Sequence, residues 1–165
     1  MKKKIFILTA VFMLTLLSTG LAQMRWQKII TTDAYRYYFD SSTIAYGQMA
    51  ILNQEKTSKI DKNVIVFLAQ KVYWNPQDTI TILQQINNNI DWTTMTYSVG
   101  QYKYDINNNN LWQGDISFFT NDGRMLGTVH RNIWNDIGKS SDEERICQYL
   151  MKYAKENNQS LKDHT

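Results

Sequence analysis

Alternating oxygen-bearing side chains in "YDINNNNLWQGD" are the first feature with chemical potential, because they resemble a calcium-binding loop. Asp105, Asn107 and Asn109 occupy alternate positions, as the first three ligands of an EF-hand loop do. Such a loop also needs a glycine at its sixth position and a bidentate carboxylate at its twelfth, and here these are Asn110 and Ile116. Because both requirements fail, we interpret the stretch as a turn between two strands and predict no metal site.

Side chains suited to nucleophilic or acid–base catalysis are few. Of the 2 histidines, His164 falls among the final residues, which leaves His130 as a candidate base. Cys147 is a conceivable nucleophile, but a cysteine on the apolar flank of a helix usually packs in the core. Asp115 and Asp122 flank one strand as a conceivable carboxylate pair, although such edge acids are mostly solvated. We predict no catalytic residue and no cofactor; a hydrolytic enzyme built on His130 and scattered acids is the catalytic alternative.

The N-terminal segment "MKKKIFILTAVFMLTLLSTGLAQ" has the layout of a cleavable export signal. Consecutive lysines precede an apolar run that is short for a membrane-spanning helix, and Gly20 and Ala22 then suit a signal peptidase. We predict removal of residues 1–22, which places the mature protein in the periplasm, at the cell surface or in the medium, without stable membrane insertion. An uncleaved N-terminal anchor is the alternative.

Charge excludes one large class of partner. Of the 18 Lys and Arg residues, three precede residue 23, whereas none of the 15 acidic residues do, so the mature chain has 15 of each. A neutral domain lacks the basic surface that nucleic acids require, and we predict no nucleic-acid partner. No Gly-rich phosphate loop, paired-histidine motif or Cys-x-x-Cys is present.

The mature chain is long enough for one hydrophobic core. We predict a single α+β domain over residues 23–156 and a flexible tail over residues 157–165. Its 10 tyrosines and 5 tryptophans are typical of a globular protein. Cys147 is the only cysteine and cannot form an internal disulfide. We predict that it is buried; pairing with a second chain, as in a homodimer, is the alternative.

Alternating apolar residues predict strands through the first half. In "YRYYFD", Tyr35, Tyr37 and Phe39 share one side, as in a half-buried strand. "WQKII" before it and "STIAYGQMAIL" after it also indicate strands. "NVIVFLAQKVYW" (63–74) begins as a continuous apolar run, which predicts a strand in the middle of the sheet. Residues 75–89 are ambiguous, because an Asn-Pro start favours a helix and Thr-Ile-Thr-Ile a strand; we favour a short helix.

Glycine residues mark a bulge and a turn among the strands that follow. Apolar residues lie at odd positions from Met95 to Val99 but at even positions from Tyr102 to Tyr104, which predicts a bulge near Gly100. The sequence "TNDG" between "DISFF" and "RMLGTVH" predicts a hairpin turn.

The segment "SSDEERICQYLMKYAKENN" predicts a C-terminal helix. Ser140 or Ser141 suits the N-cap, with a glutamate three residues on as the second half of a capping box. Its apolar face consists of Ile146, Tyr149, Leu150 and Tyr153. Many strands followed by this helix predict the α+β class: a single antiparallel sheet of about six strands with the C-terminal helix packed on one face.

The candidate binding residues are aromatic residues that do not fall on the predicted buried side of a strand. Tyr38, Tyr46, Trp92 and Trp112 fall on the outward side of strands or in turns. Exposed tyrosine and tryptophan suit recognition of proteins or sugars, because they bring a large contact area at low entropic cost. The alternative is that these four side chains cover the edges of the core.

One pattern of motifs spans the mature chain. Trp26 leads it, "YYFDSSTI" and a central apolar strand (64–69) follow, and "WNDIGKSSDEERIC" closes it. This order resembles the surface-adhesin E family of bacterial envelope proteins, in which a leading "W", "Y-x-D-x-x-S/T-I" and "W-x-x-I-x-x-x-S…C" recur. The resemblance implies an antiparallel sheet with a C-terminal helix and contact with host or surface molecules. Its disulfide is missing, since Tyr97 and its neighbours stand where the partner of Cys147 is expected, and no binding residue carries over.

Together these observations predict an exported envelope or secreted protein that binds a protein or surface ligand in an adhesin-like role, without catalysis. A periplasmic structural or accessory domain is the main alternative. It would be favoured if Tyr38, Trp92 and Trp112 formed one exposed patch. The enzyme alternative requires a deep cleft that brings His130 and carboxylates together.

Overall fold

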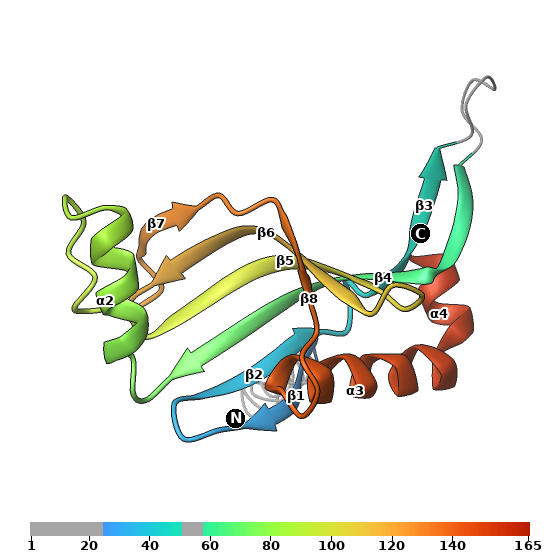
Figure 1. Ribbon diagram of the computed structural model, residues 1–165, viewed down its shortest axis with the longest axis horizontal. Helices are drawn as coiled ribbons and strands as arrows, with labels where there is room; N and C mark the ends of the chain where they lie inside the picture. The colour runs from blue at the N-terminus through green and yellow to red at the C-terminus, as the bar shows by residue number, and fades with distance from the viewer. Residues whose placement is uncertain (1–24, 51–57) are drawn as a thin grey trace, which may run out of the picture.

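One antiparallel sheet with helices on one face forms the body of the computed structural model, which describes residues 25–50 and 58–165 (Figure 1). The eight strands are β1 (Trp26–Thr31), β2 (Tyr35–Asp40), β3 (Ala45–Ala50), β4 (Ser58–Tyr73), β5 (Tyr97–Asp105), β6 (Asn110–Phe119), β7 (Met125–Val129) and β8 (Ile133–Asp136). Their order is β1-β2-β4-β5-β6-β7, with β3 paired to β4 and β8 paired to β6. The helices are α2 (Gln77–Ile86), α3 (Asp142–Glu156) and α4 (Asn158–Asp163).

The predicted α+β class is confirmed, with eight strands in place of about six. The short strand β8 has no counterpart among the predicted elements. All of its residues are exposed, so no alternation of apolar and polar side chains marks it in the sequence. The predicted signal, residues 1–22, lies outside the described residues.

Strand β4 is central, as its apolar run predicts. Its first part pairs with β3, its last part with β2, and β5 runs along its other side. Ile65, Phe67 and Ala69 are buried beneath the helices. Because side chains alternate between the two faces of a strand, Lys71 and Tyr73 point to this same helix-bearing face.

The predicted bulge is present, but its extra residue belongs to β6. Pairing skips one residue of β5 after Gly100 and two residues of β6 between Gln113 and Ile116. All four buried residues of β5 lie at even positions, so the predicted change of phase within β5 is wrong. Tyr97, expected inside, stacks on Phe119 on the opposite face with 4.9 Å between ring centroids.

Both predicted turns are confirmed. At the end of β5 the Asp105 carboxylate accepts hydrogen bonds from the backbone N–H groups of Asn107 (2.9 Å) and Asn108 (3.0 Å). Asn109 then adopts a left-handed backbone with φ 51°. In the turn between β6 and β7, Gly123 has φ 85°, which glycine tolerates without strain. The asparagine-rich stretch is therefore a hairpin turn.

Helix α3 begins with the predicted capping box. The Ser141 hydroxyl accepts from the Glu144 N–H (3.1 Å), and the Glu144 carboxylate accepts from the Ser140 N–H (2.6 Å). The buried residues of α3 are Ile146, Cys147, Leu150 and Ala154. The predicted burial of Cys147 is confirmed, and burial raises the pKa of its thiol to about 12.

The structure corrects the expectation of a flexible tail over residues 157–165, because most of these residues form a helix. Residues 158–163 form α4, in which Leu161 is fully buried. His164 Nδ1 lies 3.1 Å from the carbonyl oxygen of Ile44, and the Thr165 hydroxyl accepts from the Tyr46 N–H. The tail was misread because a single apolar residue, Leu161, anchors it, and one residue makes no periodic pattern.

Helix α2 confirms the helical reading of the ambiguous segment. It starts after Pro76, with no side-chain cap, and buries Ile80 and Leu83. These pack with Trp92 and Phe118 in a cluster separate from the larger one beneath α3 and α4. None of the helices within residues 25–50 and 58–165 has the length and apolar character needed to cross a membrane.

The corner after β2 centres on the fully buried Asp40. Its carboxylate accepts from Arg25 Nε (2.7 Å), and from the Ser42 N–H (3.0 Å) and hydroxyl (2.6 Å). Burial alone would raise the pKa of this carboxyl, but the hydrogen bonds from Arg25 and Ser42 outweigh it and lower the pKa. "YYFDSSTI" thus builds a structural corner.

Candidate ligand-binding groove

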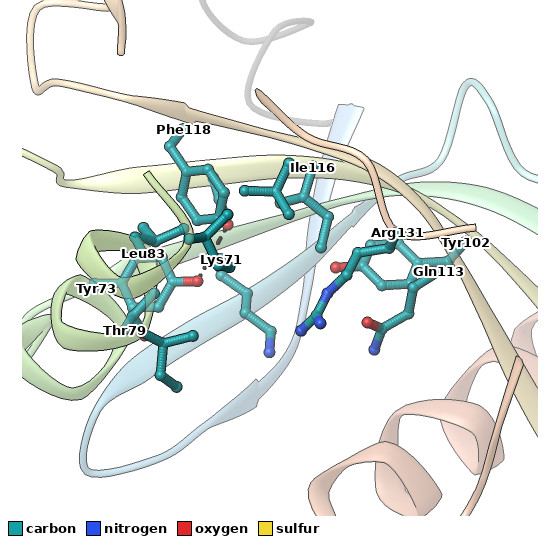
Figure 2. A pocket seen from close by; sticks show the side chains of 13 residues that line it. Lys71, Tyr73, Thr79, Leu83, Tyr102, Gln113, Ile116, Phe118 and Arg131 are labelled. Carbon is teal, nitrogen blue, oxygen red and sulfur yellow. Dashed lines mark hydrogen bonds between the residues drawn. The ribbon is translucent and has the colours of Figure 1, made fainter. Parts of the chain in front are cut away.

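A groove opens on the helix-bearing face of the sheet, beside α2 (Figure 2). We call it the α2 groove; it is lined by Lys71, Tyr73, Thr79, Ile82, Leu83, Ile86, Ser98, Tyr102, Gln113, Ile116, Phe118, Val129 and Arg131. Strands β4, β5 and β6 form its floor, and α2 forms one wall. Its volume is about 200 Å³, below the roughly 300–1,000 Å³ of sites for drug-sized molecules, so it suits a small ligand or a single side chain.

Lys71 brings a positive charge into the floor of the groove. It pairs with Tyr37 of β2 and Ser98 of β5, and its Nζ lies 4.6 Å from the ring centroid of Tyr35 and 5.7 Å from that of Tyr37. Burial lowers the pKa of its ammonium, while the negative charges of Glu143 and Asp142 act in the opposite direction.

Arg131 and Gln113 complete the polar part of the groove. Figure 2 shows the Arg131 guanidinium and the Lys71 amine directed toward the same part of the groove, with the Gln113 amide beside them. Arg131 and Gln113 also line an adjoining cavity of about 250 Å³ with Glu143 of α3. Among the described residues, neither Lys71 nor Arg131 takes part in an ion pair.

The remainder of the groove is apolar. Ile116 and Phe118 form its floor, and α2 contributes Leu83 together with Ile82 and Ile86, which are 53% and 52% exposed. Large apolar side chains that are half exposed at the rim of a cavity offer contact area to a bound molecule. The α2 groove therefore combines unpaired cations with an apolar wall, an arrangement that holds an anionic group attached to an apolar body.

The four aromatic candidates do not form a site. Tyr46 and Trp92 are 7% and 1% exposed, so their expected exposure is wrong. The Tyr46 hydroxyl donates to Asn158 Oδ1 (3.0 Å), and Trp92 Nε1–H donates to the Asn87 carbonyl (2.9 Å). These residues are satisfied parts of two different core clusters.

Tyr38 and Trp112 are partly buried and belong to strands at different places in the sheet. Trp112 pairs with Trp134 of β8, and its Nε1–H donates a hydrogen bond to Asn132 Oδ1 (3.0 Å). Lys103 Nζ lies 4.6 Å from the centroid of the Trp112 ring. The exposed patch of Tyr38, Trp92 and Trp112 that would favour a structural or accessory role is not formed, because Trp92 is buried on the helix-bearing face.

The candidate catalytic residues are also separate. His130 Nδ1 lies 2.8 Å from Asp115 Oδ1, but these side chains are 78% and 57% exposed. Cys147 is buried in α3, and Asp122 is bonded within the β6–β7 turn by Thr120. Within residues 25–50 and 58–165, no three His, Cys, Asp or Glu side chains gather as a possible metal-ligand set.

Sequence reasoning missed Lys71, Gln113 and Arg131, although one observation pointed to Lys71. Lys71 stands at an odd-numbered position of β4, as the buried Ile65, Phe67 and Ala69 do. A lysine therefore occupies an inward position of a buried strand. A charged residue on the buried phase is expensive unless it is paired or functional. Arg131 follows β7 in a short connection, and no local pattern links it to Lys71.

Comparison with models of known protein families, with curated proteins and with solved structures found no match.

Proposed function

We propose that this chain is an exported envelope or secreted protein that works by binding a protein or surface ligand, in the manner of an adhesin, and not by catalysis. The carrying observation is the α2 groove, in which Lys71 and Arg131 point into one space without an ion-pair partner among the described residues. The predicted export signal and the resemblance to surface-adhesin E proteins agree with this role.

The groove suits binding because its floor is built on paired strands of the sheet. Lys71 and Gln113 stand on paired strands in the interior of the sheet, so a ligand meets groups that are already positioned. Lys71 is partly buried without an ion-pair partner among the described residues. It is therefore costly to the folded protein, which is the expected cost of a site that awaits an anionic partner.

The structural or accessory role, with a possible homodimer, is the second hypothesis. An exposed patch of Tyr38, Trp92 and Trp112 would have favoured this role, and Trp92 is buried. The recognition role is supported by a separate observation, the α2 groove. We therefore rank recognition first.

The export part of the proposal is tested with the full chain carrying a C-terminal epitope tag. We expect mass spectrometry of the purified protein to find Gln23 at the N-terminus and cell fractionation to find the tag outside the cytoplasm. Recovery of the uncleaved chain from the cytoplasm alone would refute an envelope role.

The binding part compares three forms of the purified protein on intact cells and on immobilised envelope material. We expect the double variant Lys71→Met/Arg131→Gln to lose retention, while Arg124→Gln, which removes an exposed arginine outside the groove, retains it. Equal retention of all three forms would remove the α2 groove from the proposal.

A further inference from the structure

The charge balance around the α2 groove selects the charge of its ligand. Lys71 and Arg131 contribute two positive charges, and Glu143, which lines the adjoining cavity, contributes one negative charge. The neighbouring Asp142 is already engaged, since its carboxylate accepts from the Tyr35 hydroxyl (2.8 Å) and from Arg145 Nη1 (3.2 Å). One net positive charge remains, which matches a singly charged anion better than a doubly charged phosphate.

The donors in the groove match a carboxylate. An arginine offers a planar fork of N–H groups, a lysine offers three N–H donors, and the Gln113 amide adds two more. A carboxylate has two oxygens that together accept about four hydrogen bonds. Figure 2 shows these three donor groups around one space, which allows them to hold such a group together.

The apolar wall sets the rest of the ligand. Ile82 and Ile86 are half exposed at the rim, and Ile116 and Phe118 lie below them. A volume of about 200 Å³ leaves space for a short aliphatic chain and not for a large ring system.

We propose that the α2 groove binds an aliphatic group that ends in a single carboxylate, with Lys71, Arg131 and Gln113 holding the carboxylate and α2 covering the aliphatic part. This inference rests on the proposed binding function and names its ligand chemistry. Such a group has two sources: a free short-chain carboxylic acid, and the C-terminal residue of a protein that ends in a leucine-like side chain.

Calorimetric titration of the purified protein tests the ligand class with sodium hexanoate, its neutral counterpart hexanamide, and inorganic phosphate. We expect hexanoate to bind, and hexanamide and phosphate to bind at least about tenfold more weakly, because they lack the charge or the apolar body. Phosphate binding as tight as hexanoate binding, or no binding of hexanoate or of the peptide below, would overturn the proposal.

The peptide N-acetyl-Gly-Leu, with a free C-terminal carboxylate, distinguishes the two sources. Tighter binding of this peptide than of hexanoate assigns the groove to protein C-termini, and the reverse order assigns it to free acids. Its C-terminal amide is the matched control and is expected to bind at least about tenfold more weakly. Equal binding of peptide and amide would contradict carboxylate recognition.

Variants locate the site. We expect Lys71→Met and Arg131→Gln each to weaken binding of the tighter ligand by about ten- to a hundredfold, the range of a charge-assisted hydrogen bond. Lys28→Met and Arg124→Gln remove exposed cations outside the groove and are expected to leave affinity unchanged. Arg131 is exposed, so its variant folds without difficulty; unchanged affinity in Arg131→Gln would place the ligand elsewhere.

The outcomes separate this inference from the proposed function. If these carboxylates fail to bind but the double variant still loses retention on cells, the ligand class is wrong and the groove remains the binding site. If the carboxylates bind but retention is unchanged, the groove is a small-molecule site and the adhesion-like role is wrong.

Discussion

The helix-bearing face of the sheet is sealed at one end and open at the other. Beneath α3 and α4, Phe39, Leu150 and Leu161 are completely buried. Beneath α2, two residues of the helix are buried, and Ile82 and Ile86 remain about half exposed at 53% and 52%. The comparison teaches that one sheet serves two purposes: the sealed end stabilises the fold, and the open end keeps polar groups available at a cost in stability.

The largest expected contrast between the two ends comes from truncating one apolar residue in each. Leu150→Ala leaves a cavity in the sealed end and is expected to cost about 2–5 kcal/mol of unfolding free energy. Ile82→Ala removes a half-exposed side chain at the open end and is expected to cost less than about 1 kcal/mol. Urea unfolding followed by tryptophan fluorescence measures both. Similar losses would mean that the two ends are packed alike.

The Asp40 corner is the polar counterpart of the sealed end. Asp40→Ala leaves Arg25 and Ser42 without their acceptor and is expected to cost about 2–3 kcal/mol, at the low end because the Arg25 side chain is 52% exposed. Denaturant titration at neutral pH measures the loss. Asp33→Ala, which removes an exposed aspartate outside the corner, is the control and is expected to cost much less.

The pH dependence of this contribution follows from the lowered pKa of Asp40. A carboxyl with a lower pKa in the folded state stabilises the protein above its unfolded pKa of about 3.9 and loses that contribution as the pH falls through the folded value. Asp40→Asn should therefore differ most from the wild type at neutral pH and converge with it in acid. A constant difference down to the acid limit would contradict the ionised corner.

At the open end, Lys71→Met is expected to stabilise the protein by on the order of 1 kcal/mol, because it removes a partly buried charge without an ion-pair partner. Thermal unfolding at neutral pH without ligand measures the gain. Lys28→Met provides the control for loss of an exposed lysine and should change stability little. A large loss of stability in Lys71→Met would show that Lys71 is a structural residue.

The stability gained by Lys71→Met over the wild type should decrease at alkaline pH. The pKa of Lys71 is lowered in the folded state by burial, against the opposing charges of Glu143 and Asp142. The unfolded chain then binds more protons between the folded value and about 10.4, so wild-type stability rises with pH in that window relative to Lys71→Met. Lys71 Nζ lies against the rings of Tyr35 and Tyr37, so the comparison is made below about pH 9, where tyrosines in the unfolded chain keep their protons.

The smallest expected effect is the reaction of the Cys147 thiol in the folded protein. Its rate reports how tightly α3 is packed at the sealed end. The thiol is buried, with the pKa raised to about 12. We expect negligible reaction of the folded protein with an aromatic disulfide reagent at about pH 8, and rapid reaction in concentrated guanidinium. Rapid labelling without denaturant would show that α3 opens readily.

Local patterns predicted most of the fold. Period-two alternation located β2, a continuous apolar run located β4, the glycine-containing turn located the β6–β7 hairpin, and the serine–glutamate pair located the start of α3. These features depend on residues close together in the chain, so sequence carries them directly. The exported location and the adhesin-like resemblance stay predictions.

The errors share a different cause. Trp92 and Tyr46 were assigned to the surface because they fall in a turn or on the outward side of a predicted strand, yet both are buried in the core clusters. The phase change was assigned to β5, although the extra residue sits in its neighbour β6. A bulge is a property of a pair of strands, so one strand's sequence locates it without saying which strand bears it.

Sequence alone determined the α+β class, the order of the main elements and the equal numbers of acidic and basic residues after residue 22. It could not determine the α2 groove, because Lys71, Gln113 and Arg131 belong to different segments that meet only when β4, β5 and β6 pair. Strand pairing brings distant residues to one face at fixed spacing, and no local period records which residues will meet. Tertiary structure therefore decided where the unpaired charges gather.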